Sequence, residues 1–461
     1  MKKFSFVLLL ITLSIFTIVL ASCDFDDSTT HVHEEGLLPR IESTCATHGK
    51  TEGKYCLICD AVLVPQEELP LKPHTYGADL CCTECGFEKF SEGLYYKLNR
   101  HGNGYELAGI GTCTDTEIII PDTYEGLPVT AIYDLRSFEN VTSIKIPASV
   151  EYLDTHPLNI CKSITKIEVD ENNKNYKSID GHLYSKDGEM LIKYAIGKEA
   201  TSFVIPDSVK WIYDDAFLGC NFLINVTIPD SVKYIGDRAF LDCDSLTSVT
   251  IGNSVTSIGT WAFVRCTSLI SITIPDSVEF IGGEAFKNCT SLTNVTIGNS
   301  VTRIGDGAFE NCTSITNAII GNSVTRIGDN AFSGCTSLTS IAIPDSVEFI
   351  NESAFYNCTS LTSAIIGNSV AWIGKYAFQN CASLKSVIIP DSVTSIGYDA
   401  FAYCTSLESV IIPSSVTSIG NNAFGSCYSL TIYCAAESQP DGWAPYWKHD
   451  DCPVVWGYKD E

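Results

Sequence analysis

The chain has 461 residues, of which 45% are hydrophobic and 18% are charged, and its formal net charge is −26. A chain with this apolar fraction buries a large core and does not have the composition of a disordered protein. Its strong negative charge repels nucleic-acid phosphates, so we expect no nucleic acid among its partners.

The N-terminus has the features of a bacterial lipoprotein signal. Two lysines precede an apolar run from Phe4 to Leu20, and a lipobox, Leu-Ala-Ser-Cys, ends at Cys23. We expect residues 1–22 to be a signal peptide and Cys23 to carry the lipid, with no transmembrane helix in the mature chain. The alternative is an ordinary signal peptide or a signal anchor with a chance cysteine. Residues 23–40 are polar and acidic, as expected of a tether.

Residues 41–90 are rich in cysteine and histidine and include two C-x-x-C pairs. Structural zinc takes four Cys or His ligands, and one C-x-x-C turn supplies two of them. We therefore expect structural zinc in a ribbon-like module, although disulfides or free thiols are alternatives. The candidate ligands are Cys45, Cys56, Cys59, His74, Cys82 and Cys85, with His31 or His33 in a second arrangement. The module offers no evident general base, so a catalytic metal is not expected.

Residues 91–134 are interpreted as an N-terminal cap followed by a first divergent coil. Two strand-like runs, 94–98 and 105–110, flank the polar segment 99–104, which predicts a hairpin. A terminal coil of a repeat array needs a polar cover, which this hairpin would provide.

Residues 135–427 form an internal repeat, which becomes regular at Cys220 and then has a period of 23 residues. A fixed period of this length is typical of a solenoid, in which each repeat is one coil stacked on the next. Residues 428–461 break the pattern with tryptophans and are expected to cap the array. One cysteine opens each regular coil: Cys220, Cys243, Cys266, Cys289, Cys312, Cys335, Cys358, Cys381, Cys404 and Cys427.

The coil that opens at Cys266 illustrates the expected structure. Alternating residues at 272–274 predict one short strand, and 278–281 a second, with the turn Pro275-Asp276-Ser277 between them. The segment 282–288 is predicted to be a helical turn. Stacking would place equivalent residues about 4.8 Å apart in parallel ladders. The predicted inward positions are Leu269, Ile272, Ile274, Val278, Ile281, Ala285 and Phe286.

The repeated run I-P-D-S-V-T-S-I-G-x-x-A-F-x-x-C-T-S-L resembles the BspA-like leucine-rich repeat proteins of bacterial surfaces. Segments 110–115 and 124–129 are similar to those that open such arrays. The resemblance covers roughly residues 91–461. It implies a leucine-rich-repeat solenoid with 23-residue coils of short parallel β-strands plus helical turns. It also implies adhesion to proteins of a host or a neighbouring cell, but it assigns no binding residues.

The repeated cysteines are interpreted as small buried hydrophobes, since each coil contributes a single thiol before a buried leucine. Cys434 and Cys452 in the C-terminal cap are better candidates for a disulfide.

The sequence does not predict an enzyme. There is no histidine between His182 and His449, so the regular coils lack the usual general base. No phosphate-binding glycine loop or hydrolase nucleophile motif stands out.

Function is therefore expected on outward positions that vary while the core is kept. The fifteenth position of the coil, counted from the cysteine, carries aromatic residues and arginine, which are enriched at binding hot spots. The eighth position changes from threonine to isoleucine along the array, which is a second candidate stripe. The alternative for both is packing along their own sheets. The partner-binding candidates are Trp211, Tyr234, Phe280, Arg303, Arg326, Phe349 and Trp372.

These features predict an exported protein, lipid-anchored at the bacterial cell surface, that binds a protein partner on another cell or matrix without catalysis. Capture of extracellular glycan or peptide is the main alternative, and a structural spacer is the third.

Overall fold

The computed structural model of the chain describes residues 34–58, 60–77, 82–85, 89–133 and 139–459. The chain divides into two compact units, Met1–Lys89 and Phe90–Glu461. The predicted signal peptide, Cys23, and the candidate ligand Cys59 lie outside the described residues.

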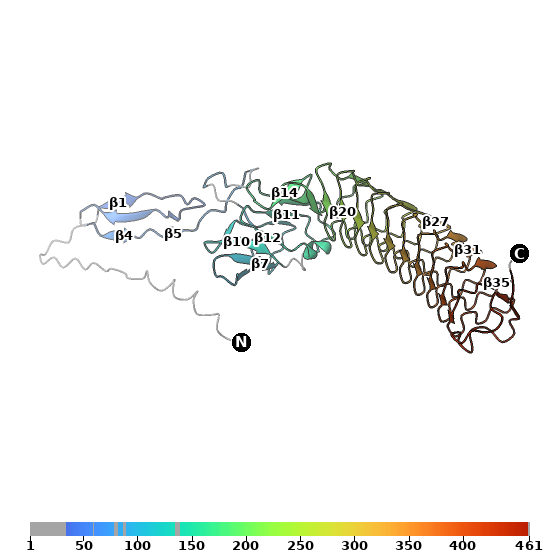
Figure 1. The fold of residues 1–461 in the computed structure, drawn as a ribbon. Helices are drawn as coiled ribbons and strands as arrows, with labels where there is room; N and C mark the ends of the chain where they lie inside the picture. Colours follow the sequence, from blue (N-terminus) through green and yellow to red (C-terminus); the bar gives the residue numbers. More distant parts are fainter. Residues whose placement is uncertain (1–33, 59, 78–81, 86–88, 134–138, 460–461) are drawn as a thin grey trace. The chain divides into compact units, whose positions relative to one another are not determined.

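The first unit consists of short antiparallel strands joined by long connections (Figure 1). One sheet has the order β1-β3-β4, and β2 pairs with β5 in a separate two-stranded sheet. Only two to four residues form each strand, so the connections carry much of this unit. The strands are β1 (Glu35–Leu38), β2 (Gly49–Lys50), β3 (Gly53–Cys56), β4 (Val62–Val64) and β5 (Glu68–Leu69).

The second unit begins with an antiparallel hairpin of β6 (Tyr95–Leu98) and β7 (Tyr105–Gly109), which confirms the predicted hairpin. Strand β7 then pairs in parallel with β10, and β10 with β12, so the coils start directly on the hairpin. Other early elements are β8 (Glu117–Ile119), β9 (Thr123–Tyr124), β10 (Leu127–Ile132), β11 (Ser143–Ile146), β12 (Tyr152–Leu153), the 3₁₀ helix η1 (His156–Asn159) and β13 (Lys166–Val169).

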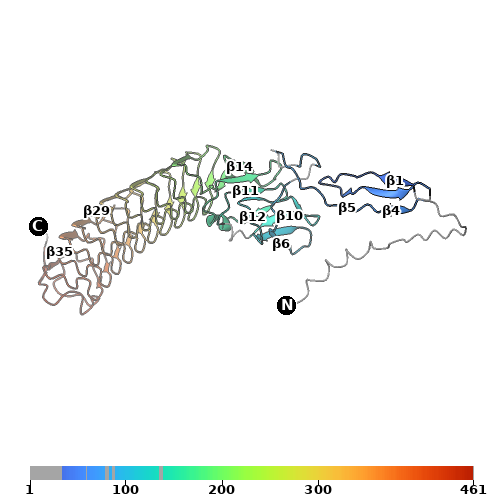
Figure 2. The ribbon, with the colours of Figure 1, turned by 180° about the vertical axis from the view of Figure 1, so that it is seen from behind.

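The coils that follow stack in register, as Figures 1 and 2 show from β20 to β35. A 13-stranded sheet runs along one side of the stack, and it is parallel from β16 onward. Its strands are β14 (Tyr176–Ile179), β15 (His182–Ser185), β16 (Met190–Lys193), β18 (Trp211–Ile212), β20 (Tyr234–Ile235), β22 (Ser257–Ile258), β24 (Phe280–Ile281), β26 (Arg303–Ile304), β28 (Arg326–Ile327), β30 (Phe349–Ile350), β32 (Trp372–Ile373), β34 (Ser395–Ile396) and β36 (Ser418–Ile419).

The other strand of each coil joins a second set of parallel ladders. These ladders have the orders β17-β19-β21, β23-β25-β27 and β29-β31-β33-β35-β37-β38. The strands are β17 (Ser202–Val204), β19 (Asn225–Thr227), β21 (Ser248–Thr250), β23 (Ser271–Ile274), β25 (Asn294–Ile297), β27 (Asn317–Ile319), β29 (Ser340–Ala342), β31 (Ser363–Ile365), β33 (Ser386–Ile388), β35 (Ser409–Ile412), β37 (Thr431–Cys434) and β38 (Val454–Trp456).

The core is a set of identical side chains stacked between coils. All seven inward positions predicted for the coil at Cys266 are buried. The phenylalanine of each regular coil stacks on that of the next, from Phe217 to Phe424, with ring centroids between 4.6 and 5.5 Å apart. Continuous burial of this kind gives each coil its stability through its two neighbours.

The prediction of a helical turn at residues 282–288 is wrong. Glu284 and Asn288 have left-handed φ values of 54° and 61°, and a left-handed residue every fourth position prevents an α-helical hydrogen-bond ladder. The amides of Glu284, Phe286 and Asn288 instead donate to carbonyls of the next coil, at Asp306, Ala308 and Glu310. This segment is therefore a third ladder made of turns. Among the described residues, η1 is the single helical element.

Two tryptophans close the C-terminal end of the core. Trp447 meets Phe424 edge-on, with ring centroids 6.0 Å apart, and the Nε1–H group of Trp443 donates to the carbonyl of Val416 at 3.0 Å. The predicted disulfide between Cys434 and Cys452 is wrong, because both are separate thiols. The thiol of Cys452 instead donates to the carbonyl of Cys427 at 3.2 Å.

Candidate functional site

The fifteenth position of successive coils forms one continuous row on the 13-stranded sheet, which we call the outward row. Neighbouring members are direct partners in the parallel ladder. Each is followed by a fully buried isoleucine, so the strand directs the row away from the core. The row consists of Trp211, Tyr234, Ser257, Phe280, Arg303, Arg326, Phe349, Trp372, Ser395 and Ser418.

The large members of the outward row are accessible. Trp211, Phe280 and Phe349 are each about two-fifths exposed and Arg326 is exposed, whereas Tyr234, Arg303 and Trp372 are half-buried. All seven partner-binding candidates from the sequence therefore lie on one surface.

Two arginines lie at the centre of this row. Arg303 and Arg326 are direct partners on β26 and β28, and Phe280 and Phe349 flank them. Like charges directly opposite one another destabilise a sheet. Within the described chain, Asp306 lies near Arg303, with a closest N···O distance of 3.7 Å. The two arginines together form a local positive centre on a strongly acidic protein.

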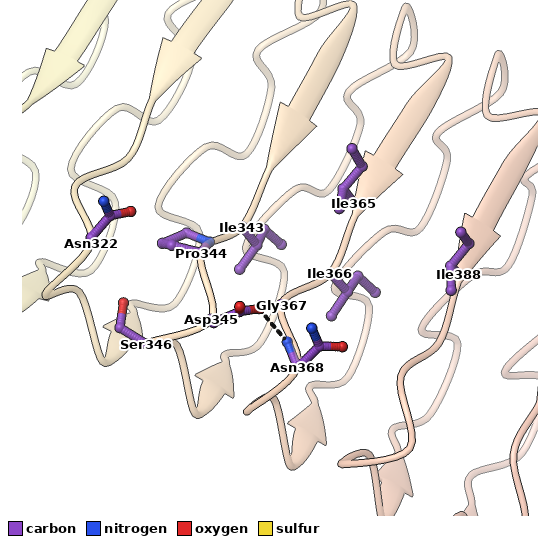
Figure 3. A pocket seen from close by; sticks show the side chains of 10 residues that line it. All are labelled: Asn322, Ile343, Pro344, Asp345, Ser346, Ile365, Ile366, Gly367, Asn368 and Ile388. Carbon is purple, nitrogen blue, oxygen red and sulfur yellow. Dashed lines mark hydrogen bonds between the residues drawn. The ribbon is translucent and has the colours of Figure 1, made fainter.

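A shallow trough follows the eighth position of the coils on the other strand. One part of it is an open hollow of about 590 Å³ that includes Ile365, Ile388 and the turn from Pro344 to Ser346 (Figure 3). A second hollow of about 380 Å³ includes Thr273, Thr296 and Ile319, and Asn322 lines both.

The sequence did not predict that the turn residues would line an exposed trough. The backbone N–H of Asn368 donates to Asp345 Oδ1 at 2.8 Å, the contact drawn dashed in Figure 3. The available signal was Asp or Asn at the eleventh position of each coil from Cys220 to Cys381. Ile319, Ile365 and Ile388 are each more than half exposed along the same trough.

The repeated cysteines are fully buried thiols. Burial raises the pKa of Cys358 to about 12, because the thiolate would be separated from water. This environment makes the ladder a part of the core rather than a reactive site.

The first unit brings four of the six predicted metal ligands together. The ligand atoms of Cys45, His74, Cys82 and Cys85 all lie within 4.8 Å of one another. Cys45 Sγ is 3.5 Å from Cys82 Sγ, and Cys85 Sγ is 3.4 Å from His74 Nδ1. The sulfur separation is well beyond a disulfide bond of about 2.05 Å. It is close to the separation of two thiolates on a tetrahedral ion with metal–sulfur bonds of about 2.3 Å.

The chain positions explain this group. Cys45 precedes β2, whereas His74, Cys82 and Cys85 follow β5, and the antiparallel pairing of β2 with β5 aligns these connections. This group could hold a metal ion. Cys56 ends β3 outside the group, and the N–H of Ile58 donates to its sulfur at 3.4 Å.

Burial raises the pKa of Cys82, but hydrogen bonds from the backbone of Cys85 and Glu84 and from the side chains of His74 and Cys45 outweigh it, so that the pKa falls to about 5. The deprotonated thiol is the form in which cysteine binds a metal ion.

In the part of the chain that the structure describes, no helix has the length and apolar character needed to cross a membrane.

Comparison with protein families gives a match to the BspA type leucine rich repeat region, in six copies, over residues 111–187, 194–316 and 302–431. The chain is similar to a leucine-rich repeat protein from Bacteroides ovatus, with 27% identity over 80% of this chain and 100% of that one, and a TM-score of 0.59. It is also similar to a leucine rich cell surface protein from Faecalibacterium prausnitzii, with 31% identity over 75% of this chain and 93% of that one, and a TM-score of 0.45.

No curated protein matches the chain. The matching family consists of repeat proteins, which are usually non-enzymatic, and it indicates no catalytic activity.

Proposed function

Because the chain belongs to the BspA-type leucine-rich repeat family, we propose that it is a non-catalytic binding protein of the bacterial cell surface. Family members are typically found there. In this proposal residues 1–22 direct export, Cys23 carries the lipid, and the residues between Cys23 and β1 separate the folded units from the membrane. The solenoid then binds a protein partner on another cell or in the matrix, in an adhesive role.

The outward row is the observation that carries the proposal. Exposed aromatic residues and arginine are enriched among the few residues that supply most of the free energy of protein association. Here they occur on adjacent rungs that the buried isoleucines hold in place. A row of Ser or Thr would satisfy the sheet equally well, as Ser257, Ser395 and Ser418 do in the same row.

The central arginines define the chemistry of the partner. Arg303 and Arg326 would be matched by carboxylates, while Phe280 and Phe349 would be covered by apolar side chains on either side. The proposed partner surface is therefore an acidic centre with an apolar surround. Because this chain is strongly acidic, it would repel an acidic partner at long range. Specificity would then come from the contacts of the two arginines and the flanking phenylalanines.

The test compares two sets of serine substitutions in the full chain. Phe280→Ser, Arg326→Ser and Phe349→Ser together alter the outward row, and Tyr428→Ser with Tyr446→Ser alter exposed aromatics outside it. Beads carrying each protein are applied to layers of neighbouring bacterial cells and to immobilised matrix proteins. We expect the row variant to lose at least tenfold in adhesion and the control to keep it. Equal adhesion by both variants would contradict the proposal.

The trough along the eighth position favours the second candidate, capture of glycan or peptide. Its hollows adjoin exposed isoleucines and the Asp/Asn turns, which combine apolar and hydrogen-bonding surface. A glycan array tests this with the Ile365→Ser and Ile388→Ser variant. Binding on the array that this variant loses would favour capture. If neither surface binds anything, the spacer interpretation applies.

We also propose that the group of Cys45, His74, Cys82 and Cys85 takes up zinc with a structural role. Three thiolates and one imidazole form a closed tetrahedral set that leaves no position for a substrate. The ligands come from connections on both sides of a two-residue strand pair, so the ion would hold together a unit with a small core.

A further inference from the structure

Lys193 is the one lysine that is completely buried among the described residues. It lies at the end of β16, directly before the regular coils. The backbone N–H of Tyr194 donates to the carbonyl of Ala216, and the two rings of Tyr194 and Phe217 stack at 5.2 Å. These are the contacts that join the Phe of each regular coil to the next. Lys193 therefore occupies the position where every following coil has a fully buried alanine.

The amine of Lys193 is held against two groups. Its Nζ donates to Asn159 Oδ1 at 2.5 Å and to the carbonyl of Asp215 at 2.7 Å. Asn159 is the last residue of η1, and Lys193 is 34 residues further along the chain. A buried ammonium group has a large desolvation cost, which hydrogen bonds to two neutral oxygens offset only in part. Burial lowers the pKa of Lys193 to about 8, so that a neutral, nucleophilic amine is accessible near neutral pH.

From this geometry we propose that Lys193 and Asn159 form an intramolecular amide bond after folding. The lone pair of Lys193 Nζ attacks Asn159 Cγ, the carbon that carries the oxygen already bound to the amine. The bond from Cγ to Nδ2 then breaks, and Nδ2 leaves as ammonia with the proton that Nζ gives up. One amide replaces another, so the step needs no oxidant, reductant or cofactor. The product is neutral, which removes the buried charge.

The surroundings fit this reaction. Asp215 is a positioning residue, because its carbonyl fixes Nζ while its buried carboxylate is held by Arg238 at 2.8 Å. His156 lies three residues before Asn159 in η1, so both side chains project from one side of the 3₁₀ turn. Its Nε2 is 3.6 Å from Asp215 Oδ2. Beside it lies a pocket of about 260 Å³ lined by Thr155, His156 and Ile192, the residue directly before Lys193.

The bond would tie η1 to β16 at the junction of the divergent and regular coils. Residues between them include the inserted hairpin of β14 and β15, which the regular repeat does not contain. A covalent link there would keep the first rungs of the stack together when the surface protein is pulled. This role is independent of which partner the solenoid binds.

Peptide mapping of the full chain by tandem mass spectrometry tests the proposal. We expect the tryptic peptides that contain Asn159 and Lys193 to be joined, with a combined mass one ammonia below their sum. Trypsin should also fail to cleave after Lys193. The Lys193→Met and Asn159→Ala variants should give no joined peptide, whereas Lys210→Met, directly before the adjacent strand β18, should keep it.

Separate peptides at their sequence masses from the folded wild-type protein would overturn the proposal. Loss of ammonia from the Asn159 peptide alone would also overturn it, because a succinimide has that mass without a link to lysine. The wild-type map decides by itself even if a variant fails to fold.

Discussion

Cys312 Sγ lies 3.0 Å from the carbonyl oxygen of Phe286, whose ring stacks on that of Phe309, and the thiol donates a hydrogen bond to it. The same contact recurs for nine successive cysteines at 3.0–3.3 Å. In the turn segment, backbone amides such as those of Phe286 and Asn288 already donate to carbonyls of the next coil. Each carbonyl that accepts a thiol also accepts the backbone N–H of the cysteine three residues further on, as Phe286 does from Cys289 at 3.2 Å, so the thiol is a second donor to a buried oxygen.

We therefore predict that Cys312→Ala destabilises the solenoid by about 1–2 kcal/mol, from the lost sulfur volume and the lost second hydrogen bond to the Phe286 carbonyl together. Urea unfolding followed by circular dichroism measures this. The exposed neighbour provides the control, since Thr313→Ala should change the free energy of unfolding by less than about 0.5 kcal/mol. Equal effects of the two substitutions would show that the thiol has no structural role.

The buried thiols should also make the fold sensitive to alkaline pH. The pKa of Cys358 is raised by burial from 9.0 to about 12, so the unfolded chain loses this proton first as the pH rises. Stability from the protonated thiol is thus fully present below pH 9 and is lost progressively towards pH 12. Melting temperatures measured from pH 8 to 11 should fall, and fall less in Cys358→Ala. A pH-independent difference between the two proteins would contradict this.

Alkylation gives a separate test of the same burial. At pH 8 iodoacetamide should label the exposed Cys85 in metal-free protein and leave Cys289, Cys312 and Cys335 unlabelled until the protein is denatured. Mass spectrometry of the labelled peptides reads this directly. Labelling of the ladder at the same rate as Cys85 would mean that the coils open in the native state.

Two adjacent glycines allow a matched test of coil spacing. A Cβ on Gly282 would lie 2.5 Å from the backbone carbon of Gly259 in the preceding coil, whereas a Cβ on Gly283 would meet nothing closer than the Asp306 carbonyl oxygen at 3.5 Å. We expect Gly282→Ala to destabilise by more than about 2 kcal/mol, as overpacking does, and Gly283→Ala to be neutral or slightly stabilising. Thermal unfolding of the two variants measures this difference. An effect of Gly282→Ala no larger than that of Gly283→Ala would show that neighbouring coils can move apart.

The sequence predicts the core of this fold well because a repeat samples the same physical constraint many times. The positions of Leu269, Ile272 and Phe286 are apolar in every regular coil, and their burial explains this pattern. The turn segment is different. Its left-handed positions hold Trp261, Arg265 and Tyr376 as well as Asn and Gly, so residue type does not reveal them. Bonds to the next coil select this conformation, and they become visible only once the coils are stacked.

The candidate sites divide in the same way. The outward row follows from the period alone, since equal coil length places Arg303 beside Arg326. The metal ligands do not follow from spacing: the C-x-x-C pair at Cys82 joins the distant Cys45, and Cys56 remains outside this group. Pairing of β2 with β5 determines that choice, and two-residue strands leave almost no periodic signal. Lys193 was missed because its coil carries the inserted hairpin of β14 and β15, so its equivalence to the repeated alanine shows only once the coils are stacked.

Removal of metal should affect the two units differently. If zinc is held by Cys45, His74, Cys82 and Cys85, purified protein should contain about one zinc ion for this site, and a strong chelator should remove it. The first unit has few buried apolar residues beyond these cysteines, so its ordering depends on the ion, and trypsin should then cleave it. The solenoid has its own continuous core, and its melting temperature should be unchanged.

Elemental analysis of Cys85→Ser should show loss of this ion, whereas Cys113→Ser, in the second unit, should retain it. Full zinc content in Cys85→Ser, or a first unit that resists trypsin without metal, would refute this assignment.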